Sequence, residues 1–341
     1  MNLLKSVAFT AAAATVAVAG AVNAGTLEDV KAKGFVQCGI STGVPGFAFT
    51  DEKGNWQGFD PAICQGVAAA VLGDSSKVKY TPTTGKTRFT VLRAGEVDLL
   101  ARNTTWTFSR DTDLQLTFLG VNYYDGQGFM VPKALGIKSA KELDGASVCI
   151  QTGTTTELNL ADYFRVNGMK YEPVPIETNN EARTNYVAGR CDVYTTDASG
   201  LAATRTTFEN PDDHMVLPEI ISKEPLGPLV RHGDDKWGDV VRWVLNVMIN
   251  AEEYGVTSAN VNKHAAAAGN NPEINRMLGT EGDLGGMIGL DKQWAARVIA
   301  QVGNYSEVFE KNIGSKTPIG LSRGLNALYT DGGLLYAPPM R

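Results

Sequence analysis

The sequence predicts an α/β protein built from two similar lobes, and two observations carry this prediction. Strand-like and helix-like segments alternate from residue 34 to 101, and the alternation restarts near residue 146, which is typical of largely parallel sheets with helices on their faces. In addition, AGEVDLLARNTTW, starting at Ala94, matches AGRCDVYTTDASG, starting at Ala188. Both segments pass from a helix end through Gly and Asp into a short strand and a polar cluster. Each lobe should therefore end a strand in a polar patch, where open α/β sheets bind ligands.

The first lobe begins with a strand in GFVQCGIS (34–41). A helix follows, which Asp60 can cap, with Pro61 in its first position and Gly73 after its last. Alternation then predicts a strand in KVKYTPT, a helix in RFTVLRAG and a strand in VDLLA, at 77–83, 88–95 and 97–101.

The second lobe repeats this order. A capping box of Thr154 and Glu157 begins a helix that stops at Gly168. Around it we expect strands and one more helix, the strands at 146–151, 171–176 and 191–196 and the helix at 180–189. A long helix from residue 237 has the apolar spacing of a core-packing helix, and the Gly-rich end of the chain is expected to be an ordered appendage with helical stretches such as 291–312.

The first 24 residues predict a secretory signal peptide. Lys5 precedes an apolar run from Val7 to Ala19, and Val22 and Ala24 occupy the positions that signal peptidase reads, so cleavage is expected after Ala24. A membrane anchor is the weaker alternative, because the run is short and rich in Ala rather than Leu. Cleavage leaves 317 residues and, through the loss of Lys5, changes the net charge from −6 to −7. The mature chain is then exported, and its mild acidity without a basic run argues against nucleic acid as a partner.

Four cysteines remain after cleavage. An even number in an oxidising compartment predicts two disulfides, for which three pairings exist. We favour Cys38 with Cys64 and Cys149 with Cys191, because each pair then lies within one half of the chain. Metal ligation is the weaker alternative, since the sequence has no CxxC and none of its three histidines has ligand spacing near a cysteine.

Three polar segments together indicate a site for a zwitterion. In RNTTWTFSR (102–110), Arg110 presents a planar fork that suits a carboxylate, and neutral Asn and Thr side chains precede it. In QTGTTTE (151–157), a helix start leaves N–H groups that favour an anion, and Gly153 permits close approach. Asp197 follows a strand and suits an ammonium group. Taken singly, these features are also explained by a solvated loop, by helix capping and by a loop carboxylate.

As an ordered set, these segments resemble the periplasmic solute-binding proteins of polar amino acid ABC transporters. The resemblance covers about Gly34 to Tyr254 and rests on GNWQGFD, RAGEVD, the threonine-rich run ending in Arg110, GTTTE and GRCDVYTTD. In length, cysteines and C-terminal extension, the chain is most similar to the general L-amino acid-binding proteins.

The resemblance implies a Venus-flytrap fold, in which two α/β lobes are joined by two crossovers, here near Tyr124–Gln127 and Glu219–Leu226. The implied division assigns 25–125 and 223–270 to lobe I, 126–222 to lobe II and 271–341 to an extension packing on lobe I.

The resemblance also implies roles for individual residues. Arg110 would bind the ligand α-carboxylate, supported by Thr105 and by the helix start at Thr154 and Thr155, while Asn103 and Asp197 would bind the α-ammonium.

Three further residues are expected to face the ligand. Phe47 would lie against it, in a first loop, STGVPGFAF, whose Pro-Gly pair departs from the common pattern, and Trp106 would form a wall. Arg88 lies where binders of acidic amino acids place a side-chain-recognising Arg, which indicates a preference for Glu, Asp, Gln or Asn.

The implied function is broad-specificity binding of free L-amino acids by lobe closure in the periplasm of a Gram-negative bacterium, followed by delivery to inner-membrane ABC permease subunits. No catalytic residue, cofactor or metal is expected, and the protein should be a monomer. Two alternatives stay open. One is an exported enzyme on the same fold, similar to cyclohexadienyl dehydratase, with Glu157 as general acid. The other is a ligand-sensing module.

Overall fold

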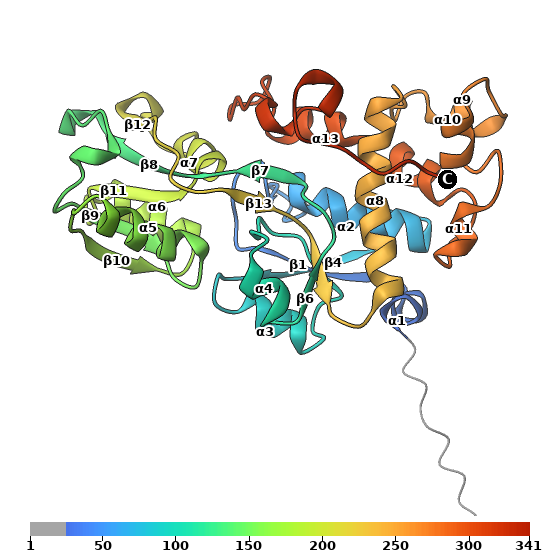
Figure 1. Ribbon diagram of the computed structural model, residues 1–341, viewed down its shortest axis with the longest axis horizontal. Helices are drawn as coiled ribbons and strands as arrows, with labels where there is room; N and C mark the ends of the chain where they lie inside the picture. The colour runs from blue at the N-terminus through green and yellow to red at the C-terminus, as the bar shows by residue number, and fades with distance from the viewer. Residues whose placement is uncertain (1–24) are drawn as a thin grey trace, which may run out of the picture.

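The computed structural model describes residues 25–341, and the predicted signal peptide lies outside the described residues. The chain forms two α/β lobes, each built on a five-stranded sheet, with a helical C-terminal segment beside the first of them (Figure 1). We call the lobe with the N-terminal sheet lobe I and the other lobe II. The predicted two-lobed α/β fold is confirmed.

The sheet of lobe I has the strand order β4-β1-β5-β14-β6. Its strands are β1 (Val36–Ser41), β4 (Val78–Thr83), β5 (Leu99–Leu100), β6 (Leu116–Phe118) and β14 (Leu229–Arg231), and a separate hairpin pairs β2 (Phe49–Thr50) with β3 (Trp56–Gln57). β1 runs parallel to β4 and β5, whereas β14 is antiparallel to both of its neighbours. The sheet is therefore largely parallel, as predicted, with one reversed strand.

The sheet of lobe II has the order β10-β9-β11-β8-β12. Its strands are β8 (Gln127–Pro132), β9 (Ser147–Gln151), β10 (Glu172–Ile176), β11 (Val193–Asp197) and β12 (His214–Val216). Here β8 is antiparallel to both of its neighbours. In each lobe, the reversed strand is thus the one that follows directly on a crossover between the lobes.

The two crossovers are β7 (Tyr123–Asp125) and β13 (Glu224–Leu226), which run side by side between the lobes in Figure 1. They pair antiparallel with each other, with Glu224 opposite Asp125 and Leu226 opposite Tyr123. Both strands overlap the crossovers expected from the sequence. A two-stranded ribbon is the only sheet that connects the lobes in the described part of the chain.

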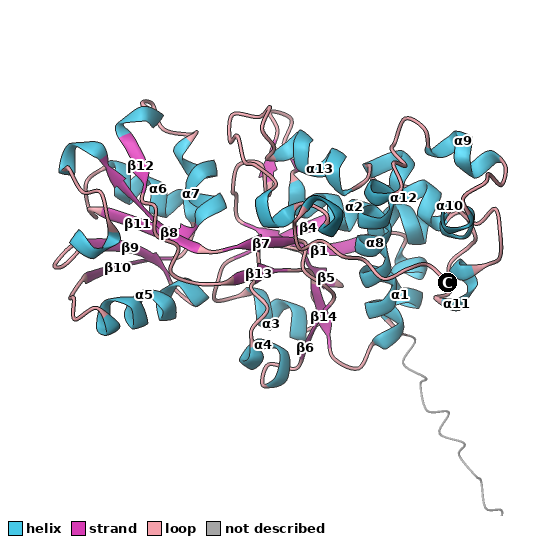
Figure 2. Cartoon of the chain, turned by 45° about the horizontal axis from the view of Figure 1, so that its top comes forward, coloured by secondary structure: helices cyan, strands magenta, loops and turns pink. Residues whose placement is uncertain are grey.

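Helices pack against both sheets (Figure 2). Lobe I carries α1 (Thr26–Lys33), α2 (Phe59–Leu72), α3 (Arg88–Arg93), α4 (Phe108–Thr112) and α8 (Asp235–Glu253), and lobe II carries α5 (Thr155–Val166), α6 (Asn179–Val187) and α7 (Ala198–Arg205). The C-terminal segment adds α9 (Val261–Ala266), α10 (Pro272–Met277), α11 (Leu284–Met287), α12 (Trp294–Val302) and α13 (Tyr305–Asn312). Short 3₁₀ turns lie at Lys133–Leu135, Ala140–Glu142, Pro211–Asp213, Gly324–Asn326 and Tyr329–Asp331.

One continuous hydrophobic core joins lobe I to the C-terminal segment. Trp237 and Val244 of α8, Trp294 of α12 and Phe309 of α13 are all buried in it. Their burial removes large apolar surfaces from water, so the C-terminal helices stabilise the lobe on which they pack.

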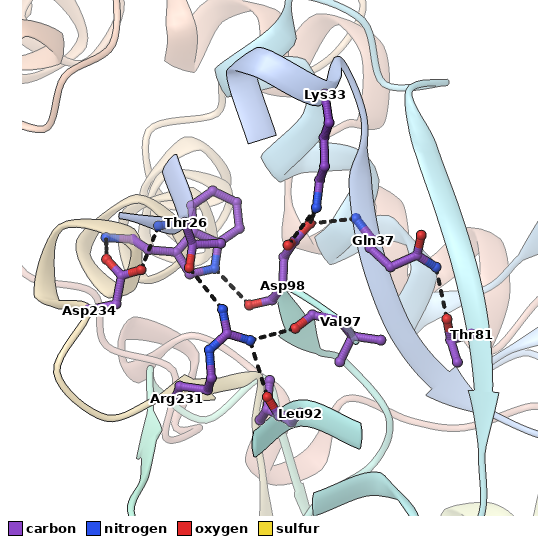
Figure 3. Close-up of polar contacts among 10 residues, drawn as sticks. Thr26, Lys33, Gln37, Thr81, Leu92, Val97, Asp98, Arg231 and Asp234 are labelled. Carbon is purple, nitrogen blue, oxygen red and sulfur yellow. Dashed lines mark hydrogen bonds and ion pairs between the residues drawn. The ribbon is translucent and has the colours of Figure 1, made fainter. Parts of the chain in front are cut away.

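The matching segments that start at Ala94 and Ala188 each contain an aspartate, Asp98 or Asp192, which makes the same kind of contact in its lobe. Asp98 accepts hydrogen bonds from the backbone N–H of Gln37 at 2.7 Å and from Lys33 Nζ at 2.6 and 2.7 Å (Figure 3). In lobe II, Asp192 accepts from the backbone N–H of Ser147 at 2.9 Å. In both lobes, this carboxylate joins the start of one strand to the start of its parallel neighbour.

Three predicted details differ in the structure. Helix α2 begins at Phe59 after Gly58, and the Asp60 carboxylate accepts from the backbone N–H of Asn103 at 3.2 Å rather than capping the helix. At α5, Thr154 accepts from the backbone N–H of Glu157, but the Glu157 carboxylate accepts from Gly153 and not from Thr154, so the capping box is only half formed.

The helical stretch expected over 291–312 is broken at Gly303, whose φ of 103° ends α12 before α13 begins.

Both disulfides that we favoured are present. Cys38 of β1 bonds to Cys64 of α2, and Cys149 of β9 bonds to Cys191, which lies just before β11. Each bond links a central strand to a neighbouring element of the same lobe. Separately, none of the helices within 25–341 has the length and apolar character needed to cross a membrane.

Candidate functional site

The polar patches expected at the strand ends of the two lobes meet in a pocket between them, which we call the interlobe pocket. It is lined from lobe I by Arg88, Arg102, Asn103 and Thr105, and from lobe II by Gln151, Thr154, Thr155, Thr156, Thr196 and Asp197. The pocket has a volume of about 20 Å³, which is room for roughly one water molecule and not for an amino acid. A ligand of that size therefore enters only if the lobes move apart.

Arg110 is not among the pocket-lining residues, but its side chain contacts Thr105, which is one of them. It lies in α4, whose N-cap Thr107 accepts from the Arg110 backbone N–H through its hydroxyl at 3.3 Å. The guanidinium is 7% exposed, and Nη1 donates to the Thr105 carbonyl at 2.9 Å. Burial lowers the pKa of Arg110 to about 10, against the opposing effect of the Glu224 and Asp197 carboxylates. The group remains a cation at neutral pH, and among residues 25–341 its guanidinium donates one hydrogen bond, to Thr105.

Two backbone N–H groups of pocket-lining residues, Thr105 and Thr155, are further candidates for binding an anion. Thr155 is the first residue of α5, after the N-cap Thr154, so its N–H lies at the positive end of that helix. Neither this N–H nor the N–H of Thr105 donates to any group within residues 25–341. One donor comes from each lobe, so both reach the same ligand group only when the lobes are together.

Asn103 and Asp197 also line the pocket, one from each lobe. Asn103 Nδ2 donates to Asp197 Oδ2 across the lobes at 3.4 Å, while Asn103 Oδ1 is buried without a hydrogen-bond partner in the part of the chain described. Burial raises the pKa of Asp197 well above its usual range, and the nearby carboxylates of Asp125 and Glu224 raise it further. The unpaired Asn103 Oδ1 calls for a donor, and a ligand ammonium group supplies three.

The backbone of Asn103 is held in a strained conformation. Its φ of 26° lies in the left-handed region that residues other than glycine seldom adopt. Asp60 accepts the Asn103 N–H at 3.2 Å and fixes this geometry. Strain of this kind persists where the surroundings enforce it, often at binding sites.

Arg88 joins the two lobes from the side of α3. It is 3% exposed, and it donates through Nη1 to Thr104 Oγ1 at 3.2 Å and through Nη2 to the Gly153 carbonyl of lobe II at 3.5 Å. Its Nε is buried and has no acceptor among the described residues. Arg88 therefore lines the pocket and keeps one buried donor without an acceptor among the described residues.

Two residues predicted to face the ligand do not line the pocket. Phe47 packs edge-on against Phe59 and Tyr123, with ring centroids 6.1 and 5.6 Å apart, and is 2% exposed. Trp106 stacks on Phe118 at 5.5 Å and is 39% exposed. Phe47 is thus a core residue of lobe I, and Trp106 belongs to its outer surface.

Glu157, the acid considered for an enzyme, accepts from the Gly153 backbone and is not among the pocket-lining residues.

Sequence reasoning missed four charged residues at the site. Arg102 begins RNTTW, and burial lowers its pKa to about 10. Burial also raises the pKa of Asp60 to about 7 and that of Asp125 to about 6. Glu224, which is 1% exposed, lies within the predicted second crossover. For Asp125 and Glu224, the sequence offered one signal, namely a charged residue inside a predicted crossover. Crossovers pass between the two lobes, so such a residue is expected near an interlobe site.

Comparison with known proteins identifies the family of the chain. The family described as bacterial extracellular solute-binding proteins, family 3, matches residues 36–260. The glutamate/glutamine/aspartate/asparagine-binding protein BztA of Rhodobacter capsulatus is 61% identical and aligns with 99% of this chain and 99% of its own length. The general L-amino acid-binding periplasmic protein AapJ of Rhizobium johnstonii is 58% identical over 100% of this chain and 99% of its own.

One solved structure has a sequence identity to this chain close to that of these relatives. The periplasmic binding protein of an ABC transporter from Brucella ovis, with glutathione bound, is 57% identical and superposes with a TM-score of 0.90, covering 93% of this chain and 100% of that one. The relatives named above are described as binding proteins and not as enzymes. This chain belongs to the bacterial extracellular solute-binding proteins of family 3.

Proposed function

We propose that this chain binds free L-amino acids in the periplasm and delivers them to an ABC importer. The observation that carries the proposal is that the interlobe pocket is lined by residues with donors and an acceptor that have no partner within residues 25–341. An α-amino acid carries the two groups that satisfy both sides at once.

The ligand carboxylate is assigned to Arg110 and to the backbone N–H groups of Thr105 and Thr155. Within the described residues Arg110 donates only to the Thr105 carbonyl, which leaves further N–H groups of its planar fork for a carboxylate. The two backbone donors add charge-assisted hydrogen bonds from opposite lobes. The ligand ammonium is assigned to Asn103 Oδ1 and the Asp197 carboxylate, which lie together across the lobes.

Arg88 is assigned to the ligand side chain. The relative BztA is named for Glu, Gln, Asp and Asn, and these four side chains share a terminal oxygen that accepts a hydrogen bond. The buried Nε of Arg88 offers a donor of that kind. We therefore assign this chain a preference for these four amino acids within a broader range.

The mechanism is closure of lobe II on lobe I around the ligand, because ligand contacts from both lobes exist only in the closed form. The proposal keeps the division into lobe I (25–125 and 223–270), lobe II (126–222) and an extension (271–341). It also includes export by the signal peptide in a Gram-negative cell, docking of the closed monomer on the inner-membrane permease, and no chemical step.

A second candidate ligand is a larger peptide with an amino acid head, such as the glutathione bound by the Brucella ovis relative. A cavity of about 460 Å³ lies between the lobes, lined among others by Trp56, Asn179 and Arg183. Its volume exceeds that of the interlobe pocket, and the Arg183 guanidinium suits a terminal carboxylate.

The test is calorimetry on ligand-stripped protein with the twenty L-amino acids and with glutathione. We expect binding near micromolar concentration, strongest for Glu, Gln, Asp and Asn. N-acetyl-glutamate and glutamate α-amide are the matched controls, and each should bind far more weakly because it lacks one charge of the zwitterion. If no L-amino acid binds in this range, the proposed function is wrong.

A further inference from the structure

Glu224 occupies a singular place in the described fold. It opens β13, the second crossover, and its side chain is almost wholly buried against Thr105 and Thr155, which line the interlobe pocket. Its carboxylate accepts four hydrogen bonds, from Thr105 in lobe I, from Thr155 and Asn159 in lobe II, and from Ser222 beside it. One carboxylate thus joins both lobes and a crossover.

The hydrogen bonds of Glu224 are divided evenly between its two oxygens. Oε2 accepts from the Thr105 and Thr155 hydroxyls, the latter at 2.9 Å, and these hydroxyls lie 3.2 Å apart. Oε1 accepts from Asn159 Nδ2 and from Ser222 Oγ, both at 2.7 Å. The two threonines that flank the proposed carboxylate site therefore donate their hydroxyl protons to Glu224.

This arrangement limits what the threonine hydroxyls offer a ligand. A hydroxyl has a single proton to donate, so in the closed form Thr105 and Thr155 face a ligand carboxylate with their backbone N–H groups alone. Their oxygens remain able only to accept. A hydroxyl contact to the ligand carboxylate would require the bond to Glu224 to break.

We propose that Glu224 is a positioning residue that holds the lobes together in the closed form and so sets the affinity for every ligand, without contacting the ligand itself. All four of its hydrogen-bond partners lie in the lobes, with Thr105 in lobe I and the other three in lobe II. The bond to Thr105 and the bonds to Thr155 and Asn159 coexist only while the lobes are close. The inference rests on the proposed function, since it assigns Glu224 a part in ligand-driven closure.

The alternative is that Glu224 competes with the ligand as an internal anion. Its carboxylate lies close enough to Arg110 to be the leading charge that favours the Arg110 cation. The two readings predict opposite changes in affinity when the carboxylate is removed. The four satisfied hydrogen bonds favour the positioning role, because a displaced Glu224 would leave its buried partners unpaired.

The primary test is Glu224→Ala with Glu224→Gln, measured by calorimetry against a ligand panel. Loss of hydrogen bonds to a charged group predicts a fall in affinity of about ten- to a hundredfold. The fall should be uniform across ligands, and Gln should restore part of it because its carbonyl still accepts. Unchanged or tighter binding overturns the proposal. Failure of the wild type to bind any amino acid instead overturns the proposed function.

A second pair of variants guards against misfolding and reports on closure directly. Thr155→Val removes one hydroxyl bond to Glu224 and keeps the backbone N–H, whereas its control, Thr152→Val, removes a hydroxyl that bonds within lobe II to Ile176.

All cysteines in the described chain are in disulfides, so spin labels can be placed on new cysteines at the exposed Lys53 and Lys170. Ligand-free Glu224→Ala and Thr155→Val should populate longer distances than wild type and Thr152→Val. Identical distance distributions in all four proteins would contradict the inference.

Discussion

Replacing Arg110 by alanine removes the guanidinium that we assign to the ligand carboxylate. Truncating one partner of a buried, hydrogen-bonded charge pair costs about 2–5 kcal/mol. Arg110 is 7% exposed, and the Thr105 carbonyl is the one acceptor of its guanidinium within residues 25–341, so the other N–H groups are available to a ligand. A loss of about 3 kcal/mol corresponds to a reduction in affinity of on the order of a hundredfold.

The loss should be the same for every amino acid, because all of them share the α-carboxylate. Arg110→Lys keeps the charge but not the planar fork, so an intermediate loss is expected. Calorimetry with Glu, Gln and Ala measures the effect, and thermal unfolding of the free proteins checks the fold, since the variant also leaves Asp197 and Glu224 with one fewer cation nearby. Normal binding by Arg110→Ala, or loss for some ligands only, would refute the carboxylate assignment.

Three further predictions address specificity and stability. Arg88→Ala should lower the affinity for Glu, Gln, Asp and Asn about tenfold relative to apolar amino acids, because one charged hydrogen bond contributes roughly 1.5 kcal/mol. Competition calorimetry measures this ratio, and a uniform loss of affinity for all ligands would argue against a role of Arg88 in specificity. Burial raises the pKa of Asp60 from 3.8 to about 7, so the folded chain holds a proton that the unfolded chain releases, and the free energy of unfolding should fall as pH rises from about 4 to 7. Asp60→Asn should remove up to about 4 kcal/mol of that fall, as urea unfolding at pH 4.5 and 8 can measure, whereas an unchanged pH slope would contradict it. The Cys149–Cys191 bond closes a segment with a sequence separation of 42, so replacing both cysteines by serine should lower the free energy of unfolding of lobe II by about 4 kcal/mol; an unaltered urea midpoint would show that the bond contributes little.

The fold was predictable because it follows from local patterns. Alternating apolar residues and Gly stops located the main strands and helices within a few residues, and the restart near residue 146 indicated a second lobe. The reversed strands β8 and β14 were not predicted, because their direction depends on pairing with strands far away in the sequence. Helix α1 was missed as well, since its eight residues show only a short amphipathic pattern.

The site was predictable only in part, and Glu224 shows why. Between Lys223 and Pro225 it has the local character of a surface residue, and its partners Thr105 and Thr155 are 119 and 69 residues away. Phe47 shows the reverse case, because an aromatic residue in the first loop suits either a ligand wall or the core. In the structure Phe47 packs against the rings of Phe59 and Tyr123 and so belongs to the core.

The buried charges of the site predict how it can accept both acidic and amide ligands. It combines guanidinium groups with a larger number of carboxyl groups, namely Arg88, Arg102 and Arg110 with Asp60, Asp125, Asp197 and Glu224. Burial raises the pKa of Asp60 to about 7 and that of Asp125 to about 6, so these groups exchange protons near neutral pH. A zwitterion with an amide side chain adds no net charge, whereas glutamate adds one negative charge and raises the pKa of nearby carboxyls further. Glutamate should therefore take up more protons on binding than glutamine at pH 7, which calorimetry in buffers of different ionisation enthalpy can measure. Equal proton uptake for the two ligands would show that the guanidinium groups alone balance the extra charge.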